Sequence, residues 1–126
     1  MKILLAEDDQ SIQAIAVLAL TRVGGHFVTT VKDGLETLAS AEKDRPDLIL
    51  LDVMMPNLDG FETCTRLKGM EQARDTPIIF LTAKAQMHEV QHGMNLGAIG
   101  YILKPFDPMT LHKQIEEVIK THGKAA

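Results

Sequence analysis

Residues 48–52 read Leu48-Ile49-Leu50-Leu51-Asp52, four consecutive apolar side chains that end on an acid. Two further runs have the same character, Ile3-Leu4-Leu5-Ala6 and Ile78-Ile79-Phe80-Leu81. Apolar strands without polar alternation are typical of parallel sheets that are covered on both faces. We therefore expect these three runs to form the centre of a parallel sheet.

Weaker apolar segments and amphipathic stretches complete the pattern. Phe27-Val28 and Tyr101-Ile102-Leu103 predict two further strands. Helical spacing of apolar residues predicts helices over residues 12–23, 34–43, 60–69, 86–96 and 108–122. Strands and helices thus alternate along the chain. This order predicts an α/β fold with a five-stranded parallel sheet and helices on both faces, because right-handed crossovers place helices on either side.

Composition narrows the class of protein. A length of 126 residues fits one domain. The 13 Lys and Arg against 17 Asp and Glu give a net charge of −4, which argues against binding of nucleic acid by this chain alone. A single cysteine, Cys64, fits a reducing compartment, and neither a signal peptide nor a membrane span is visible. We expect a cytoplasmic domain over residues 1–122, with residues 123–126 as a frayed tail.

Polar side chains follow four of the predicted strands. In open parallel sheets the binding site lies beyond the carboxyl ends of the strands. Each such residue alone is more often structural, since Asp and Thr commonly cap the next helix. Because such residues follow four different strands, we instead predict that they form one shared site. The residues are Glu7 and Asp8 after the first strand, Asp52 after the third, Thr82 after the fourth and Lys104 after the fifth.

Glu7, Asp8 and Asp52 predict a metal site. Two carboxylates ~4 Å apart repel by roughly 4 kcal/mol at an effective dielectric of 20. Protonation of one acid would relieve the repulsion, but oxygen ligands open to solvent are also what Mg²⁺ prefers, and we favour the metal. A carboxylate beside Mg²⁺, with a hydroxyl and an ammonium nearby, can attack phosphorus. We predict Asp52 as the nucleophile, because a rigid central strand aims it.

Longer strings around these residues resemble a known family. They are similar to the receiver domains of two-component response regulators, and the chain is close in size to the stand-alone chemotaxis type. The resemblance runs from Lys2 to about His122. The matching strings are ILLAEDD (3–9), Asp33-Gly34, DLILLDVMMPNLDG (47–60), PIIFLTA (77–83) and GAIGYILKPF (97–106).

The resemblance implies a fold and a chemistry. The fold would be flavodoxin-like, with strand order 2-1-3-4-5. Asp52 would accept a phosphoryl group from a phosphohistidine on a histidine kinase or a histidine phosphotransfer protein. Mg²⁺ would be bound by Asp8, Asp52 and the backbone carbonyl of Met54, with Glu7 completing the acid pair.

The resemblance also implies how the domain would signal. Thr82 would hydrogen-bond one phosphoryl oxygen after transfer, and Lys104 would pair with another. Lys104-Pro105 is the peptide bond that the family holds in cis. Tyr101 stands where the family carries an aromatic residue that rotates inward on phosphorylation. A downstream protein would bind the fourth helix, the fifth strand and the fifth helix.

From these observations we expect a single-domain phosphoryl-accepting switch. It would not be a turnover enzyme, any catalysis being limited to its own phosphorylation and dephosphorylation. The alternative is the receiver part of a larger regulator with an effector domain. A haloacid-dehalogenase-like phosphatase is disfavoured, because Met54 stands where such enzymes carry an acid. A flavin-binding protein is disfavoured by the acidic loop after the first strand.

A remote alternative is a zinc metallopeptidase. The stretch His88-Glu89-Val90-Gln91-His92 satisfies the pattern H-E-x-x-H on a predicted helix. The extended zinc-protease string is missing, because Asn95 and Ala98 stand where a glycine and a third histidine belong. Two solvent-facing histidines on a short helix are the simpler interpretation.

Overall fold

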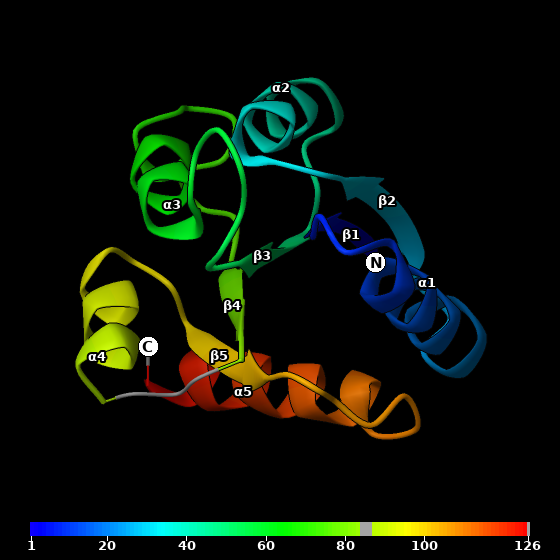
Figure 1. Ribbon diagram of the computed structural model, residues 1–126. Coiled ribbons are helices and arrows are strands. Elements are labelled where there is room, and N and C mark those ends of the chain that lie inside the picture. Colours follow the sequence, from blue (N-terminus) through cyan, green and yellow to red (C-terminus); the bar gives the residue numbers. More distant parts are fainter. Residues whose placement is uncertain (84–86, 126) are drawn as a thin grey trace.

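Parallel strands form one sheet in the computed structural model, which describes residues 1–83 and 87–125 (Figure 1). Within that part of the chain there are five strands in the order β2-β1-β3-β4-β5, so the three apolar runs lie at the centre of the sheet. The predicted architecture and strand order are confirmed. The strands are β1 (Lys2–Ala6), β2 (Phe27–Val31), β3 (Leu48–Asp52), β4 (Ile78–Thr82) and β5 (Gly100–Leu103).

Helices cover both faces of the sheet (Figure 1). One face packs against α1, η1 and α5, and the other against α2, α3 and α4. None of the helices in the described residues is both long enough and apolar enough to cross a membrane. Their bounds are α1 (Gln10–Leu18), η1 (Ala19–Val23), α2 (Gly34–Asp44), α3 (Gly60–Lys68), α4 (Met87–Asn95) and α5 (Leu111–Ala125).

The first and last predicted helices differ from the structure at their ends. The first changes after Leu18 into η1, a π-helical turn. The last begins at Leu111 because Asp107 holds residues 108–110 in a turn, accepting from the Met109 amide (2.8 Å) and the Leu111 amide (3.0 Å). It continues to Ala125, past the predicted end at residue 122. Of the fourth predicted helix, residue 86 lies outside the described residues.

β3 shows why an apolar run without alternation forms a central strand. Successive side chains of a strand point to opposite faces of its sheet. Leu48 and Leu50 enter the core beneath α1 and α5, whereas Ile49 and Leu51 enter the core beneath α2 and α3. All four side chains are fully buried. Because both faces are covered, no position of the strand favours a polar residue until Asp52.

Aspartates begin three of the helices. Asp9 accepts from the amides of Ser11 and Ile12 at the start of α1. Asp33 does the same for the Glu36 amide in α2, and Asp59 for the Glu62 amide in α3. Such N-caps satisfy amides that have no partner within the helix. These three aspartates therefore serve as helix caps.

Gly60 lets α3 begin directly against the end of β3. Its amide donates to the Val53 carbonyl over 2.9 Å. A Cβ at this position would lie 2.3 Å from the Asp52 carbonyl oxygen, which is closer than real Cβ atoms approach backbone. Any side chain here would push the start of α3 away from the residue that ends β3.

We predict that Gly60→Ala lowers the free energy of unfolding by more than about 2 kcal/mol, because the backbone must move to relieve the contact. Urea denaturation followed by circular dichroism measures the loss. The matched control is Gly69→Ala at the end of α3, where a Cβ would meet nothing closer than 3.5 Å. It should change stability by less than about 1 kcal/mol. Equal losses in the two variants would show that the close approach at Gly60 is unimportant.

Candidate functional site

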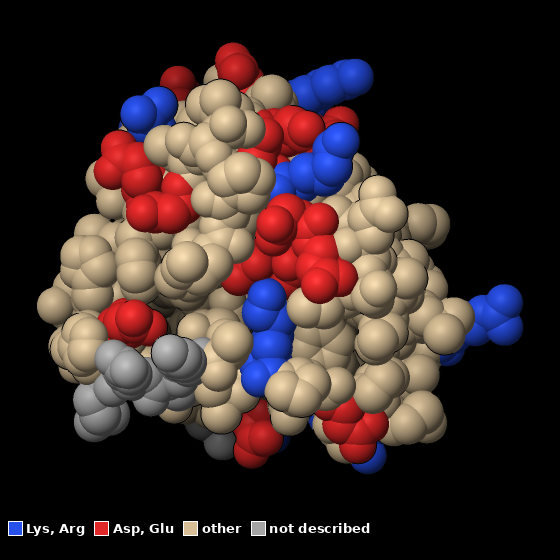
Figure 2. Space-filling model, in the orientation of Figure 1, with Lys and Arg blue, Asp and Glu red and all other residues tan. Residues whose placement is uncertain are grey.

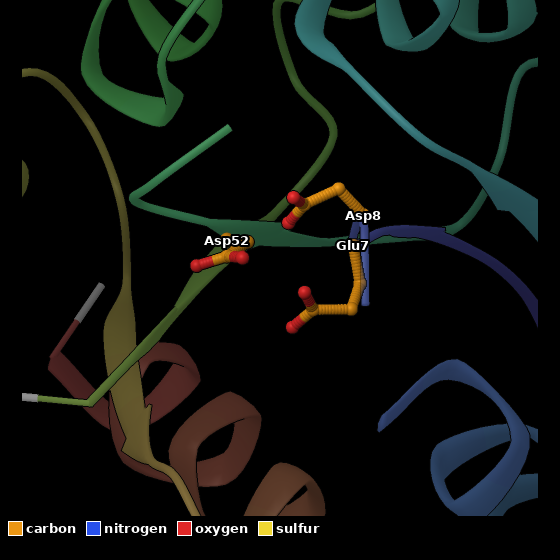
Figure 3. A group of neighbouring side chains, drawn as sticks. All are labelled: Glu7, Asp8 and Asp52. Carbon is orange, nitrogen blue, oxygen red and sulfur yellow. The ribbon is translucent and has the colours of Figure 1, made fainter. Parts of the chain in front are cut away.

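Three acids meet where β1 and β3 end (Figure 3). Glu7 and Asp8 directly follow β1, and Asp52 is the last residue of the neighbouring strand β3. One carboxylate oxygen from each lies within 4.8 Å of the other two. Glu7 is 1% exposed and Asp52 is 3% exposed, whereas Asp8 is open to solvent. The structure therefore assembles the predicted acid cluster with two of its members buried.

Lys104 lies against the two buried acids. Its Nζ is 2.7 Å from Glu7 Oε1 and 3.2 Å from Asp52 Oδ2, and its side chain is only 12% exposed. The Lys104 amide donates to the Thr82 carbonyl (2.8 Å), and the Lys104-Pro105 bond is cis, as the resemblance implied. One ammonium is thus shared between the carboxylates at the ends of two strands.

This arrangement shifts two pKa values. Burial raises the pKa of Glu7, and the Asp52 carboxylate adds to the rise, although hydrogen bonds from Lys104 and the Asp9 amide oppose it. Burial alone would lower the pKa of Lys104, but its hydrogen bond to Glu7 and the charges of Asp52 and Glu7 outweigh burial and raise it. Lys104 therefore keeps its positive charge at neutral pH and holds the acids together.

The backbone after each strand holds the carboxylates in place. The Met54 amide donates to Asp52 Oδ1 (3.2 Å), and the Asp9 amide donates to Glu7 Oε2 (3.1 Å). The Met54 side chain points away from the core and is 78% exposed. The predicted role of its carbonyl as a metal ligand remains a prediction, but the residue does lie beside Asp52.

Gln13 supports the site and was not predicted. Its side-chain amide in α1 donates to the Glu7 carbonyl (2.5 Å) and to the Val31 carbonyl (3.3 Å). It therefore ties the first turns of α1 to the ends of β1 and β2. Nothing in the sequence pattern marks this glutamine, because a polar residue on an amphipathic helix usually faces solvent.

Thr82 and Tyr101 both line one small apolar pocket. Thr82 ends β4 and is 7% exposed, whereas Tyr101 in β5 is 41% exposed. The pocket is lined by Val53, Phe61, Phe80, Thr82, Glu89, Val90, Met94, Gly100 and Tyr101. The lining of this pocket therefore includes residues from the end of β4, from the edge strand β5 and from α4.

The histidines of the zinc alternative do not form a comparable site. His88 and His92 are exposed on α4, and the His92 ring meets the Phe61 ring edge-on at 4.8 Å. Among the described residues, only Glu7, Asp8 and Asp52 form a group of three potential ligands with the spacing a metal needs. Figure 2 shows acidic side chains gathered at the centre of the viewed face, with a basic group directly below them. The structure therefore favours the acid cluster as the site.

Comparison with known proteins gives one consistent family. The model of the response regulator receiver domain matches residues 3–116. A curated relative is the alkaline phosphatase synthesis transcriptional regulatory protein PhoP of Bacillus subtilis, 40% identical over 125 residues, which are 99% of this chain and 51% of that protein. The chain thus spans about half the length of the curated relatives it matches.

Solved structures agree with the sequence relatives. The chemotaxis response regulator CheY4 of Vibrio cholerae superposes with a TM-score of 0.87 at 38% identity, covering 93% of this chain and 97% of that one. The receiver domain of the sensor histidine kinase PA1611 of Pseudomonas aeruginosa gives a TM-score of 0.84 at 34% identity, with coverage of 94% and 97%. That neighbour has a magnesium ion coordinated in its active site cleft. The chain therefore belongs to the response regulator receiver domain family of two-component systems.

Proposed function

We propose that this receiver domain accepts a phosphoryl group on Asp52 from a phosphohistidine of a histidine kinase or a histidine phosphotransfer protein. The observation that carries the proposal is the position of Asp52. It is a buried carboxylate that ends a central strand, with an ammonium 3.2 Å away on one side and further acids on the other. An attacking carboxylate must be held in a fixed orientation, and a nearby cation stabilises the negative charge of the transferring group.

The charge balance of the site supports Mg²⁺ as the cofactor. Glu7, Asp8 and Asp52 bring three carboxylates, and Lys104 compensates one of them. Two negative charges remain, which suits a divalent cation bound by oxygen ligands. Asp8 and Asp52, with the Met54 carbonyl, would be its protein ligands. When bound, Mg²⁺ would supply positive charge that stabilises the transferring phosphoryl group.

The residues of the chain then carry out the transfer. One Asp52 oxygen forms a bond to phosphorus while the bond from phosphorus to the donor imidazole nitrogen breaks, and its electron pair returns to the imidazole. Lys104 pairs with a phosphoryl oxygen, and the Thr82 hydroxyl donates to another. Because the acceptor is part of the protein, the domain acts as a switch and not as a turnover enzyme.

The pocket between Thr82 and Tyr101 supports a path from the site to a binding surface. Movement of Thr82 toward the phosphoryl group would free space that the Tyr101 ring can fill. The surface that changes would then comprise α4, β5 and α5, and a downstream protein would bind there. We place this exchange between kinase and target in the cytoplasm.

Different relatives support two settings for the domain. Similarity to a chemotaxis response regulator over 97% of that chain supports a single-domain switch. Similarity to transcriptional regulators that are twice as long supports a receiver joined to an effector domain. In either setting the net charge of −4 gives this domain no electrostatic attraction for nucleic acid.

We predict that acetyl phosphate with Mg²⁺ adds the mass of one phosphoryl group, read by intact-mass spectrometry. Asp52→Asn should abolish the adduct because the amide is a poor nucleophile, and chelation of Mg²⁺ should prevent it. Asp8→Ala should need a higher Mg²⁺ concentration to form the same amount of adduct. The control is the double variant His88→Ala with His92→Ala, which should keep the adduct. An adduct on Asp52→Asn, or its loss in the histidine variant alone, would place the site elsewhere.

We predict that Lys104→Met lowers the free energy of unfolding by about 3 kcal/mol at pH 7.5 without Mg²⁺, because two buried carboxylates lose their cation. Loss of Lys104 raises the pKa of Glu7 further, so the folded variant binds a proton more readily than the unfolded chain. Its deficit should therefore shrink as pH falls toward 5. Urea denaturation at pH 7.5 and at pH 5 measures the loss of stability and its dependence on pH. The exposed Lys120→Met is the control. A deficit that is independent of pH would refute this electrostatic explanation.

We predict that beryllofluoride, a phosphoryl mimic, shifts amide resonances from Asp52 through α4, β5 and α5. In Tyr101→Ala the shifts should stay near Asp52, because no ring fills the pocket. Phe27→Ala, at an exposed aromatic residue of β2, is the matched control and should respond as the unmodified chain does. If shifts in the unmodified chain never reach residues 87–122, the output surface is wrong, and α1 around Gln13 and Val17 becomes the candidate.

A further inference from the structure

Two histidines form a pair away from the acid cluster. His26 lies between η1 and β2, and His112 is the second residue of α5. His26 Nε2 is 2.9 Å from His112 Nδ1, and the ring centroids are 4.8 Å apart. Both residues are half-buried. The contact joins the first turn of α5 to the segment that leads into β2.

Each histidine also contacts a charged group with its other ring nitrogen. The Met1 amino nitrogen lies 3.1 Å from His26 Nδ1. On the α5 side, Glu116 Oε1 lies 2.5 Å from His112 Nε2, one helical turn further on. The two rings therefore lie in a row of polar contacts that runs from the amino group to the carboxylate.

The contact between the two rings depends on their protonation. A hydrogen bond between His26 Nε2 and His112 Nδ1 needs one nitrogen that carries a proton and one that accepts it. The bond can therefore form while at least one imidazole is neutral. With both rings protonated, two N–H groups would face each other across 2.9 Å and each ring would carry a positive charge. The contact is therefore lost when both imidazoles are protonated.

The surroundings of His26 disfavour a positive charge on its ring. Burial lowers the pKa of His26, and so do the Met1 ammonium and His112, while Glu116 opposes them. Arg22, the charged residue of η1, is exposed. A Cβ on Gly24 would lie 2.8 Å from both His112 Nδ1 and His26 Cδ2, so a glycine is needed where the rings meet.

We propose that His26 and His112 form a pH-sensitive latch that holds the start of α5 against η1 and β2 while at least one of the two imidazoles is neutral. Protonation of both rings opens it. Because neutral His26 is favoured in the folded chain, the stabilisation is present above the ordinary histidine pKa of about 6.5 and is lost as pH falls below it. The latch holds the start of α5, which lies at the end of the segment that begins at Lys104. Protonation of the two rings therefore gives the switch a second input.

The test is nuclear magnetic resonance of the imidazole nitrogens between pH 8 and 5. At pH 7.5 one of His26 Nε2 and His112 Nδ1 should carry a proton and the other should not, and His26 should titrate below 6.5. Hydrogen exchange should show that protection of amides 111–116, corrected for intrinsic rates, falls several-fold between pH 7.5 and 5.5.

Variants separate the latch from general effects of acid. His112→Gln should lower protection of amides 111–116 at pH 7.5 and leave it independent of pH, while phosphorylation of Asp52 persists. His88→Gln, on exposed α4, should retain the full pH response. Protons on both His26 Nε2 and His112 Nδ1 at pH 7.5, or on neither, a His26 pKa above 6.5, or a pH response that survives in His112→Gln would overturn the latch and leave the proposed phosphoryl transfer untouched.

Discussion

The ammonium of Lys104 lies between two buried carboxylates, Glu7 and Asp52, and the rest of the site is arranged around that contact. Neither acid could remain charged at its depth without a cation, because burial removes the water that would stabilise it. The sheet order places the ends of β1 and β3 side by side, and the cis peptide after Lys104 follows the strand end that completes the site. The fold therefore creates a repulsion between acids and supplies only part of its compensation. In the proposed function this uncompensated negative charge attracts a divalent cation, whose positive charge then favours the approach of a phosphoryl group.

The sequence predicts much of this arrangement because the signals are local. Four apolar residues in a row at 48–51 have one stable position in an α/β fold, the middle of a covered parallel sheet. Polar residues directly after such strands then lie at one edge, so the sequence alone is enough to place Asp52, Glu7 and Lys104 together. The aspartates at positions 9, 33 and 59 resemble the site acids in the sequence, and only their hydrogen bonds identify them as helix caps.

What the sequence could not predict depends on contacts between distant segments. Gln13 belongs to the polar face of α1, and its bonds to two strand ends follow from how that helix crosses the sheet edge. The late start of α5 depends on the side chain and carbonyl of Asp107, a residue that is equally compatible with a helix or a turn. The pairing of His26 with His112 joins residues that are 86 positions apart. Periodicity carries no information about such pairs.

The acid cluster and the histidine latch lie at the two ends of one segment of chain. Lys104 begins it in the site, and His112 ends it at the first turn of α5. A change in the pairing of Lys104 and a change in the protonation of His112 thus act on the same helix. In this account a phosphoryl group and a proton are two inputs to one surface, each through a local change of charge.

The central claim is that the charges left uncompensated at Glu7, Asp8 and Asp52 create a site for a divalent cation. Its most direct test is the free energy of unfolding, measured at constant ionic strength over a range of Mg²⁺ concentrations, for the unmodified chain and for Asp52→Asn. Stability of the unmodified chain should rise by about 1.4 kcal/mol for each tenfold increase of Mg²⁺ above its dissociation constant. Asp52→Asn should be at least as stable without Mg²⁺, since the repulsion is relieved, and should need far more Mg²⁺ for any gain. Equal stabilisation of the two proteins, or none in either, would contradict the account.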